Sequence, residues 1–379
     1  MKILFTGGGT GGHFYRIIAV AEDMRLIAKQ NHLIDLELYY MSTTPYDAGL
    51  LFERDITFIQ NSAGKIRRAS NAVNFVKNFF DLFKISWGSL TSIWSVYKVY
   101  PDVIFGVGGY ASFPALLAAR ILRIPVVIHE TDSAPGKVNA WAGTFATRIA
   151  VSYPESVRYF KVDKVAVTGC PVRTELQEVL TAGAFEFLKL DATIPTLFVI
   201  GGSQGAQNIN EVIVDSLPRL LNKYQIIHQT GQNNIRAVEE VARAMLASHP
   251  YADRYKPFAY LNVLAMRMSA GAAKLVISRA GSTIFEIASW QRPAIIIPIP
   301  EPTSHDQTKN AFAYARTGAA VVLEEKNLSP HILEAEIDRI MNNPKEQAKM
   351  SEAAKTFQHP DAAHKIATEI LNIALSHEQ

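Results

Sequence analysis

Short runs of apolar residues alternate along the chain with longer segments in which apolar residues repeat every three or four positions. The short runs predict buried strands and the longer segments predict amphipathic helices, an order typical of β–α–β units and parallel sheets. The predicted strands fall into two series: 3–5, 36–40, 103–105, 126–128, 148–151 and 165–168, then 197–200, 224–227, 275–277, 294–297 and 320–323. The sequence therefore predicts an α/β protein in which each half forms a doubly wound parallel sheet.

The length of the chain and one turn near its middle predict where the halves divide. A chain of 379 residues is too long for one ordinary hydrophobic core, so two domains are expected. The turn Gly169–Arg173 separates the two series of strands, and the last part of the chain has the pattern of helices. We expect a first domain at residues 1–170, a second at 171–345, and terminal helices at 346–379.

A glycine-rich turn follows the first predicted strand of each half. The run Lys2–Thr6 leads into GGGTGGH (Gly7–His13), and the run Thr196–Ile200 leads into GGSQGA (Gly201–Ala206). Glycines let the backbone approach a phosphate closely, and the N-terminus of the following helix attracts an anion through its free N–H groups and its dipole. Two such turns in one chain predict two phosphate-bearing ligands.

The residues around these turns argue against two common nucleotide-binding classes. Gly7, Gly9 and Gly12 satisfy G-x-G-x-x-G, but the next predicted strand ends in YYMS and lacks the acid that holds the ribose of a dinucleotide. Neither turn has the Lys-Ser/Thr pair of a P-loop. An oxidoreductase with a nicotinamide or flavin cofactor and a P-loop NTPase are both disfavoured.

Three residues of the turns are candidates for chemistry or binding. His13 closes the first turn near a helix N-terminus, where the dipole keeps the imidazole neutral. A neutral ring there suits a base or a hydrogen-bond donor, but it could equally only cap its own helix. Ser203 and Gln204 in the second turn suit a diphosphate better than a nucleophile, because no G-x-S-x-G elbow is present.

A third cluster of small residues, Ser278–Thr283, precedes a predicted helix that contains Glu286. An acid in the first turns of a helix interacts well with the dipole, and it could accept hydrogen bonds from two ribose hydroxyls or simply be a capping acid. Gln307 and Asn310 are three positions apart on another predicted helix, so both amides can face one ligand.

Composition and charge limit the classes of partner. The chain is 48% hydrophobic and 19% charged, has a net charge of +3, and contains Cys170 as its one cysteine. These values predict a packed globular protein of a reducing compartment, without a disulfide and without the basic surface of a nucleic-acid binder. We also expect no signal peptide and no membrane span, because no charged leader and no run of 18 apolar residues occur.

Residues 66–87 combine basic and aromatic residues. Phe75, Phe79, Leu82 and Phe83 fall at helical spacing, with Lys65, Arg67, Arg68, Val76, Phe80 and Trp87 nearby. Such a helix could form a membrane-facing patch, or it could simply pack on its sheet with the basic residues in water.

Eight short motifs in a fixed order resemble the MurG family of N-acetylglucosaminyltransferases. They are GGTGGH at 8–13, GVGGYAS at 106–112, PG at 135–136, PVRTE at 171–175, GGSQGA at 201–206, QTG at 229–231, SRAGS at 278–282 and Q-x-x-NA from 307. Any one of them is modest evidence, but all eight in order are a specific signal over roughly residues 2–340.

The resemblance implies a GT-B fold, in which two Rossmann-like doubly wound domains face a cleft and the last helices cross back to the first domain. It implies an inverting enzyme of peptidoglycan synthesis, with UDP-GlcNAc as donor and undecaprenyl-pyrophosphoryl-MurNAc-pentapeptide (lipid I) as acceptor. It further implies that no metal and no cofactor are needed, and that the protein is peripheral on the cytoplasmic face of the membrane. That location makes the aromatic patch at residues 66–87 a stronger candidate for membrane docking.

The family pattern assigns roles to residues by their positions in the motifs. His13 is the candidate base, and the acceptor-binding residues are Thr10, Gly11, Gly12, His13, Gly109 and Tyr110. The donor-binding residues are Arg173, Ser203, Gln204, Gly205, Glu286, Gln307 and Asn310, with uracil near Tyr260–Leu264.

The chain departs from the family pattern at several positions on the acceptor side. The family usually has proline at the position of Arg16 and asparagine at the positions of Asp132 and Cys170. Asp132 is therefore a rival to His13 as the base. Two alternatives stay open: a GT-B enzyme for another lipid acceptor such as diacylglycerol, and a non-catalytic nucleotide-sugar binder.

Overall fold

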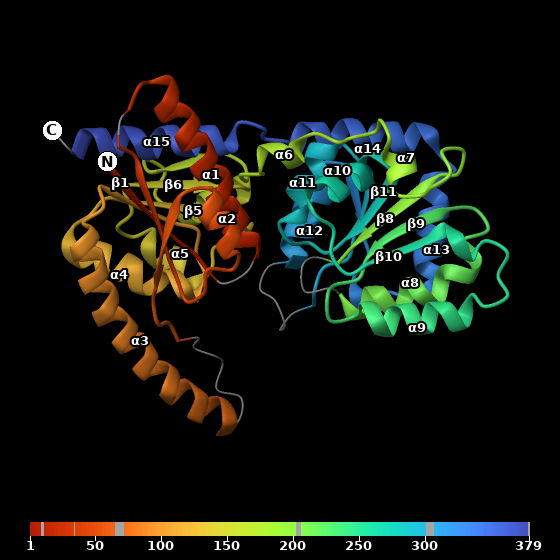
Figure 1. Ribbon diagram of the computed structural model, residues 1–379, viewed down its shortest axis with the longest axis horizontal. Helices are drawn as coiled ribbons and strands as arrows, with labels where there is room; N and C mark the ends of the chain where they lie inside the picture. Colours follow the sequence, from red (N-terminus) through yellow and green to blue (C-terminus); the bar gives the residue numbers. More distant parts are fainter. Residues whose placement is uncertain (9–10, 34, 65–71, 202–205, 301–306, 378–379) are drawn as a thin grey trace. The chain divides into compact units, whose positions relative to one another are not determined.

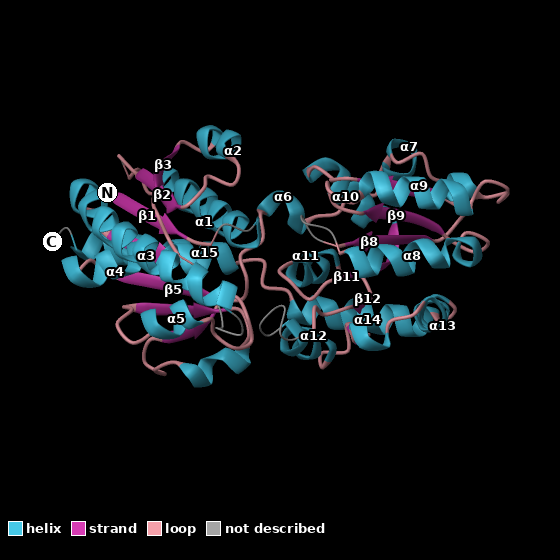
Figure 2. Ribbon diagram, turned by 90° about the horizontal axis from the view of Figure 1, so that it is seen from below, coloured by secondary structure: helices cyan, strands magenta, loops and turns pink. Residues whose placement is uncertain are grey.

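The protein forms two compact units, each built on one parallel sheet with helices on both faces (Figures 1 and 2). Unit 1 comprises Met1–Arg173 with His359–Gln379, and unit 2 comprises Thr174–Gln358. The computed structural model describes, with only the backbone for 72–83, residues 1–8, 11–33, 35–64, 72–201, 206–300 and 307–377.

The sheet of unit 1 has the strand order β3-β2-β1-β4-β5-β6-β7, and the neighbouring strands pair in parallel. Strands are added outward on both sides of β1, as in a doubly wound sheet. The strands are β1 Lys2–Thr6, β2 Glu37–Ser42, β3 Ile56–Gln60, β4 Val103–Gly106, β5 Val126–Glu130, β6 Arg148–Val151 and β7 Val165–Val167. The main helices are α1 Gly11–Gln30, α2 Ala48–Glu53, α3 Ala72–Val99, α4 Phe113–Leu122, α5 Lys137–Ala142 and α15 Ala362–His377.

Alternation of side chains along the strands divides the core of unit 1 into two layers. Helices α1 and α15 together cover one face of the sheet (Figure 1). Ile3 and Phe5 point to this face, where they join Phe14 and Ile370 in one apolar cluster. Leu4 points to the opposite face, which α3, α4 and α5 cover. The sheet is therefore buried on both sides, and its strand ends are left to carry function.

The sheet of unit 2 has the strand order β10-β9-β8-β11-β12-β13, again with parallel neighbours. The strands are β8 Thr196–Ile200, β9 Gln225–Gln229, β10 Tyr255–Phe258, β11 Ala273–Ser278, β12 Ala294–Ile296 and β13 Ala320–Val322. The helices are α6 Thr174–Gln177, α7 Ala184–Phe187, α8 Gln207–Leu220, α9 Ile235–Met245, α10 Val263–Ala272, α11 Thr283–Trp290, α12 Gln307–Ala315, α13 Pro330–Met341 and α14 Pro344–Phe357.

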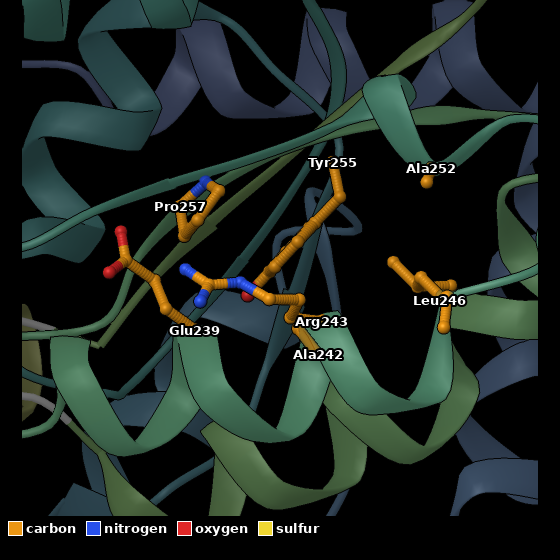
Figure 3. Close-up of a pocket in the computed structure, with 8 residues that line it drawn as sticks. Glu239, Ala242, Arg243, Leu246, Ala252, Tyr255 and Pro257 are labelled. Carbon is orange, nitrogen blue, oxygen red and sulfur yellow. The ribbon is translucent and has the colours of Figure 1, made fainter.

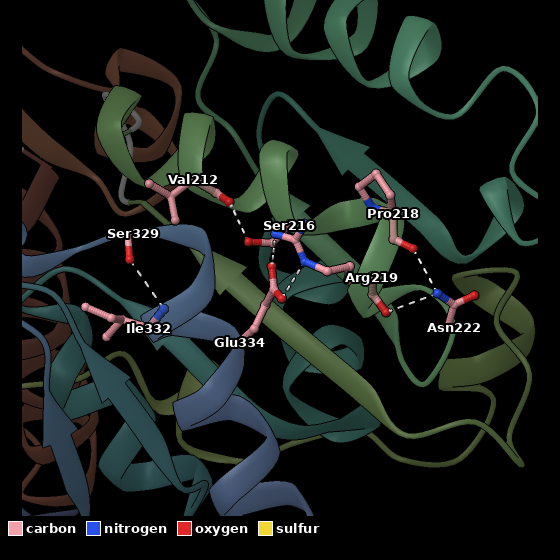
Figure 4. Close-up of polar contacts among 8 residues, drawn as sticks. All are labelled: Val212, Ser216, Pro218, Arg219, Asn222, Ser329, Ile332 and Glu334. Atoms are coloured by element: carbon pink, nitrogen blue, oxygen red, sulfur yellow. Dashed lines mark hydrogen bonds and ion pairs between the residues drawn. The ribbon is translucent and has the colours of Figure 1, made fainter.

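Helices α8 and α13 lie side by side on one face of this second sheet (Figure 4). Leu217 and Ile337 are buried between the helices and the sheet. At the rim, the Arg219 guanidinium donates two hydrogen bonds of 2.6 Å to the two carboxylate oxygens of Glu334. The helix pair is thus held by an apolar interior and one bidentate ion pair at its edge.

The predicted strands are confirmed, but two edge strands were not predicted. β3 and β10 each extend a sheet by one strand, at the ends of the orders given above. Both are only partly buried, and β10 contains Pro257, which removes a backbone donor. Polar or charged residues interrupt ITFIQ and YKPF, unlike the apolar runs of the other two edge strands, β7 and β13, so the sequence pattern did not reveal β3 and β10.

The C-terminal helices, expected together at 346–379, are divided between the units. α14 packs on α11 in unit 2, where the rings of Phe357 and Phe285 stack with centroids 5.4 Å apart. α15 returns to unit 1 and packs along α1. In the chain, the change from unit 1 to unit 2 falls between Arg173 and Thr174, three residues after the expected boundary.

Helix α3 carries the aromatic segment singled out in the sequence. It packs on α4 through residues such as Val96. Trp87 is two-thirds exposed; Phe75, Val76, Phe79, Phe80, Leu82 and Phe83 lie outside the side chains that the structure describes, and residues 65–71 lie outside it altogether. Within the described residues, no helix is both long enough and apolar enough to cross a membrane.

Candidate active site

The glycine turn of unit 1 is tied to the end of the neighbouring strand β4. The Gly8 N–H donates to the Gly108 carbonyl oxygen at 2.9 Å, and the Ser42 hydroxyl donates to the Gly7 carbonyl oxygen at 3.0 Å. Gly109 has a φ of 82°, and a Cβ at this residue would lie 2.8 Å from the Gly8 Cα. Only glycine tolerates this conformation and this close approach, so the backbone geometry alone requires the glycines.

His13 lies in the first turn of α1 and packs over the same glycines. A Cβ on Gly8 would lie 2.7 Å from the His13 Nδ1, and a Cβ on Gly109 would lie 3.3 Å from its Cε1. Burial, followed by the charge of Arg16, lowers the pKa of His13 to about 3, although the residue keeps a partly exposed edge. The ring is therefore neutral at pH 7, chiefly because it is buried, and a pKa this low makes it a weak base until a bound anion raises that pKa.

A polar cluster lies behind His13 at the carboxyl edge of the sheet. The buried Arg16 donates from Nε to the Cys170 Sγ at 3.2 Å. His129, in β5, is fully buried, and its Nε2 lies 3.1 Å from both the Gly169 carbonyl oxygen and the Ser152 hydroxyl. Burial, with Arg16 as the second cause, lowers the pKa of His129 to about 3. Arg16 is therefore a buried cation beside two histidines that are neutral at pH 7.

Glu130, the last residue of β5, is a buried carboxyl that the sequence analysis did not single out. One of its oxygens accepts from the N–H groups of Thr131 and Asp132, at 2.8 and 2.9 Å. The other accepts from the Gly136 N–H at 3.2 Å and the Asn139 Nδ2 at 2.9 Å. Burial, then the charge of Asp132, raises the pKa of Glu130 to about 7. In the sequence, the feature that could have revealed Glu130 is an acid at the last position of a predicted buried strand.

The remaining acceptor-side candidates differ in how exposed they are to solvent. Gly11 is buried, Gly12 is partly exposed, and Tyr110 follows Gly109 with 39% of its surface exposed. Asp132 is partly exposed in the loop after β5. Thr10 lies outside the described residues. The structure therefore brings His13 and Gly109 into contact, with Tyr110 as the next residue.

Arg173 was expected on the donor side, and it lies in unit 1. Its guanidinium carbon lies 4.1 Å from the centre of the Tyr15 ring on α1, a cation–π contact. Its Nε is buried and has no hydrogen-bond partner in the part of the chain that the structure describes.

In unit 2, strands β8 and β11 end side by side, and the glycine-rich sequence follows β8 in the chain. The Ser278 hydroxyl donates to the Ile200 carbonyl oxygen at 3.0 Å, and Gly201 follows directly. Helix α8 begins at Gln207, after the turn. Three predicted phosphate-binding residues of the turn lie outside the described residues: Ser203, Gln204 and Gly205.

The donor-side candidates that follow the turn come from two helices. Glu286 lies in the first turn of α11 and is partly exposed. A Cβ on Gly281 would lie 4.0 Å from the Gln307 Nε2, so α12 begins beside the small-residue turn before α11. The Gln307 Oε1 accepts from the Ile299 N–H at 3.2 Å, whereas Asn310, one turn later, is buried. The structure thus brings Gln307 to this turn.

Two further groups at this edge were not predicted as site residues. The side-chain oxygen of Gln229, at the end of β9, accepts from the Leu261 N–H at 3.2 Å, and the half-exposed Tyr260 precedes Leu261. Arg279 forms an ion pair with Glu325, which also accepts from the Asn208 side chain at the start of α8. The ends of β9, β11 and α8 are therefore fixed by side-chain amides and one ion pair.

One hollow in unit 2 lies away from these strand ends (Figure 3). It has a volume of about 340 Å³ and lies between α9 and the start of β10, with Arg243 and Glu239 on the helix side and Tyr255 and Pro257 on the strand side. Because β10 begins at Tyr255, the hollow is near the amino ends of the strands, where ligands of such sheets do not usually bind.

Comparisons with known proteins agree over nearly the whole chain. Residues 3–151 match the glycosyltransferase family 28 N-terminal domain, and residues 196–366 match its C-terminal domain. A solved structure of Acinetobacter baumannii MurG is 25% identical, covers 98% of this chain and 99% of its own, and has a TM-score of 0.73. The UDP-N-acetylglucosamine–N-acetylmuramyl-(pentapeptide) pyrophosphoryl-undecaprenol N-acetylglucosamine transferase of Natranaerobius thermophilus is 34% identical over 97% of this chain and 98% of its own. The chain belongs to the MurG family.

Another MurG relative, the same-named transferase of Halothermothrix orenii, is 35% identical over 95% of both chains. The GT-B fold that the MurG resemblance implied is confirmed by the two Rossmann-like units and by these neighbours. A UDP co-structure of S. aureus MnaA has a TM-score of 0.71 at 16% identity, which shows a shared fold alone. In the described part of this MurG-family chain, no three His, Cys, Asp or Glu side chains form a group that could hold a metal ion.

Proposed function

We propose that this protein transfers GlcNAc from UDP-GlcNAc to the 4-hydroxyl of MurNAc in undecaprenyl-pyrophosphoryl-MurNAc-pentapeptide, and so makes lipid II for peptidoglycan. The observation that carries the proposal is the match of nearly the whole chain to transferases named for this reaction, at 34–35% identity. The two glycine turns at strand ends support it, because donor and acceptor both carry a diphosphate.

The reaction needs a base beside the acceptor. The MurNAc O4 attacks the anomeric carbon, the bond from that carbon to the UDP oxygen breaks, and UDP leaves with the electron pair while a base takes the O4 proton. We assign this role to His13, which is neutral and keeps a partly exposed edge over the glycine turn. Asp132 stays a rival, since it is partly exposed at the same edge of the sheet.

The donor would be held by hydrogen-bonding groups, by one arginine and one acid, and by helix N-termini. In this proposal Ser203, Gln204 and Gly205, with Arg173, stabilise the departing UDP, and no metal or cofactor is needed. Glu286 binds the ribose hydroxyls and Gln307 and Asn310 the GlcNAc ring. Uracil lies near Tyr260–Leu264, where the Leu261 N–H is held by Gln229.

A membrane-facing surface on helix α3 would bring the enzyme to its lipid acceptor. Trp87, Leu90, Trp94 and Tyr97 recur every three or four residues and are each more than half exposed. Lys98 lies over the Trp94 ring at 5.1 Å. Aromatic side chains beside lysines suit the headgroup region of an anionic bilayer, so we propose peripheral binding to the cytoplasmic face of the membrane.

Sedimentation with anionic phosphatidylglycerol vesicles tests this surface. The double variant Trp87→Ala/Trp94→Ala should bind at least about tenfold more weakly than the wild type, because two interfacial aromatic anchors are lost. Phe52→Ala is the matched control, since Phe52 is an exposed aromatic on α2 of the same unit. Equal loss in both variants would remove α3 as the docking surface.

The function is tested with purified full-length protein, UDP-GlcNAc and a water-soluble lipid I analogue. Release of UDP together with a disaccharide product, identified by mass spectrometry, is the expected result. Transfer to diacylglycerol alone would replace the acceptor in this proposal. Tight binding of UDP without turnover on either acceptor would make the protein a nucleotide-sugar binder.

A further inference from the structure

Arg16 is a buried cation that no carboxylate neutralises among the residues that the structure describes. It is 6% exposed, and its Nε donates to the Cys170 Sγ at 3.2 Å. The Cys170 Sγ in turn lies 3.9 Å from the Pro171 carbonyl oxygen, so Cys170 is fixed between that carbonyl and Arg16. No ion pair joins Arg16 to an acid in the described chain.

Three groups that sense this charge are themselves neutral at pH 7, although the charge of Asp132 also acts on one of them, Tyr153. His13 and His129 both have pKa values of about 3, lowered first by burial and then by Arg16. Burial raises the pKa of Tyr153 well above its usual value. The His129 Nδ1 is fully buried and has no hydrogen-bond partner among the described residues. A desolvated guanidinium in such surroundings is costly unless an anion joins it.

The direction of the side chain shows where that anion would lie. Arg16 is three residues after His13 on α1, so the two share one face of the helix. Long side chains on a helix lean toward its N-terminus, and the charge of Arg16 is the second cause that lowers the pKa of His13, so the guanidinium lies near the first turn of α1. The helix N-terminus is itself electropositive, so its field adds to that of Arg16 instead of neutralising it.

We propose that Arg16 is a phosphate-binding residue of unit 1, which Cys170 orients and which supplies the fixed charge for the diphosphate of the acceptor. The ligand is a diphosphate that has oxygens free to accept hydrogen bonds from the guanidinium. This contact adds to the hydrogen bonds that the helix N-terminus donates to the same ligand. An anion placed there would also offset one of the two causes that lower the pKa of His13. The identity of the acceptor rests on the proposed function; the phosphate contact itself does not.

A purely structural role for Arg16 is the competing explanation. In that case the guanidinium would serve only to hold the loop after β7 through Cys170. A neutral residue of similar length would then alter folding stability and leave anion affinity unchanged. Binding of an anion and stability of the fold must therefore be measured separately.

The test is calorimetric titration of inorganic pyrophosphate into the full chain, with UDP present at saturation to fill the donor site. Arg16→Met and Arg16→Gln should weaken pyrophosphate binding about 10-fold, the value of one hydrogen bond to a charged group. Arg16→Lys should recover part of this affinity. Arg148→Met is the matched control, because it removes the same charge from the first residue of β6, at the opposite edge of the sheet.

Unchanged pyrophosphate affinity in a folded neutral variant would overturn the proposal, as would an equal loss in Arg148→Met. If neither neutral variant folds, the wild type decides: failure of pyrophosphate to bind beside saturating UDP also overturns it. Arg16-dependent binding by a protein that transfers nothing to the lipid I analogue would reject the proposed function and keep the phosphate site.

Discussion

At the carboxyl ends of their strands, the two sheets have the same backbone arrangement but carry different kinds of side chain. In each unit a strand leads into a glycine turn and a helix N-terminus. The edge of unit 1 gathers groups whose pKa values are shifted, namely His13, His129, Glu130 and Tyr153. The edge of unit 2 gathers amides, hydroxyls and one internal ion pair, namely Gln229, Ser278, Gln307 and Arg279–Glu325.

This difference indicates that unit 1 moves a proton and unit 2 recognises a ligand, on the same backbone framework. Perturbed titratable groups cluster where protons are moved, whereas neutral hydrogen-bonding groups recognise a ligand without changing charge. Unit 2 does contain a buried histidine, His228, but both of its nitrogens are bonded, to the Tyr255 hydroxyl and the Asn210 side chain. A shifted pKa therefore marks a reactive site only where the group also has an open side.

The largest effect should come from His13→Ala. Loss of a general base lowers kcat by about 10²–10⁴-fold, while the affinity for UDP stays within about twofold because the donor residues other than Arg173 lie in unit 2. Steady-state kinetics with the lipid I analogue and calorimetry with UDP measure the two quantities. Asp132→Asn is the matched variant. If it lowers kcat more than His13→Ala does, the base is Asp132, and loss of UDP affinity in His13→Ala would make His13 structural.

Two buried histidines, one in each unit, allow the pH dependence of the free energy of unfolding to be compared between the units. His129 and His228 are both fully buried and have pKa values lowered by burial to about 3, below the unfolded value of 6.5. Each therefore adds stability that is complete above pH 6.5 and is lost as the pH falls toward 3. Between pH 6.5 and 4.5 each accounts for a loss of roughly 2 kcal/mol.

Urea unfolding of His129→Gln and His228→Gln at pH 7, 5.5 and 4.5, followed by hydrogen exchange in each unit, measures this loss. Each variant should flatten the acid slope in its own unit. A slope that is unchanged in His129→Gln would mean that the imidazole is charged in the folded protein, against the neutral cluster described for unit 1.

The sequence predicted the common scaffold well, because that scaffold depends on local patterns. Apolar runs marked the strands buried on both faces, and glycines marked the turns. The differences between the units were harder to predict. The Arg16–Cys170 contact joins residues 154 positions apart, and the Glu130 network depends on the backbone path through Gly136 and Asn139.

Segments without a clear hydrophobic pattern were also missed. β3 and β10 are half-exposed edge strands, whose polar and apolar residues mix as they do in loops. The hydrophobic pattern alone did not show how the last helices divide between the units, although the family resemblance implied a return to the first domain. Both helices are amphipathic, and the pattern does not specify which sheet an apolar stripe covers.

On the neutral edge, Glu286→Ala should act on binding alone. Removal of an acid that accepts from ribose hydroxyls should raise the donor KM about tenfold and leave kcat within about twofold. Initial rates at varied UDP-GlcNAc, with saturating acceptor, separate the two. Glu175→Ala, an exposed acid in the first turn of α6 in unit 2, is the control. A donor KM that stays at the wild-type value would return Glu286 to the role of a capping acid.

The smallest effect should come from the rim contact between α8 and α13 in unit 2 (Figure 4). Glu334→Gln removes the carboxylate charge that accepts hydrogen bonds from the Nε and Nη2 of Arg219. The arginine is largely exposed, however, and the apolar contacts around Leu217 remain. Solvent screens such a pair, so the melting temperature should fall by less than about 2 °C, with UDP affinity unchanged. Differential scanning calorimetry at low and high salt measures the change, and high salt should abolish most of it. A larger fall that salt does not reduce would mean that the α8–α13 contact depends on this hydrogen-bond geometry, so that unit 2 is held by polar contacts at its rim as well as at its ligand edge.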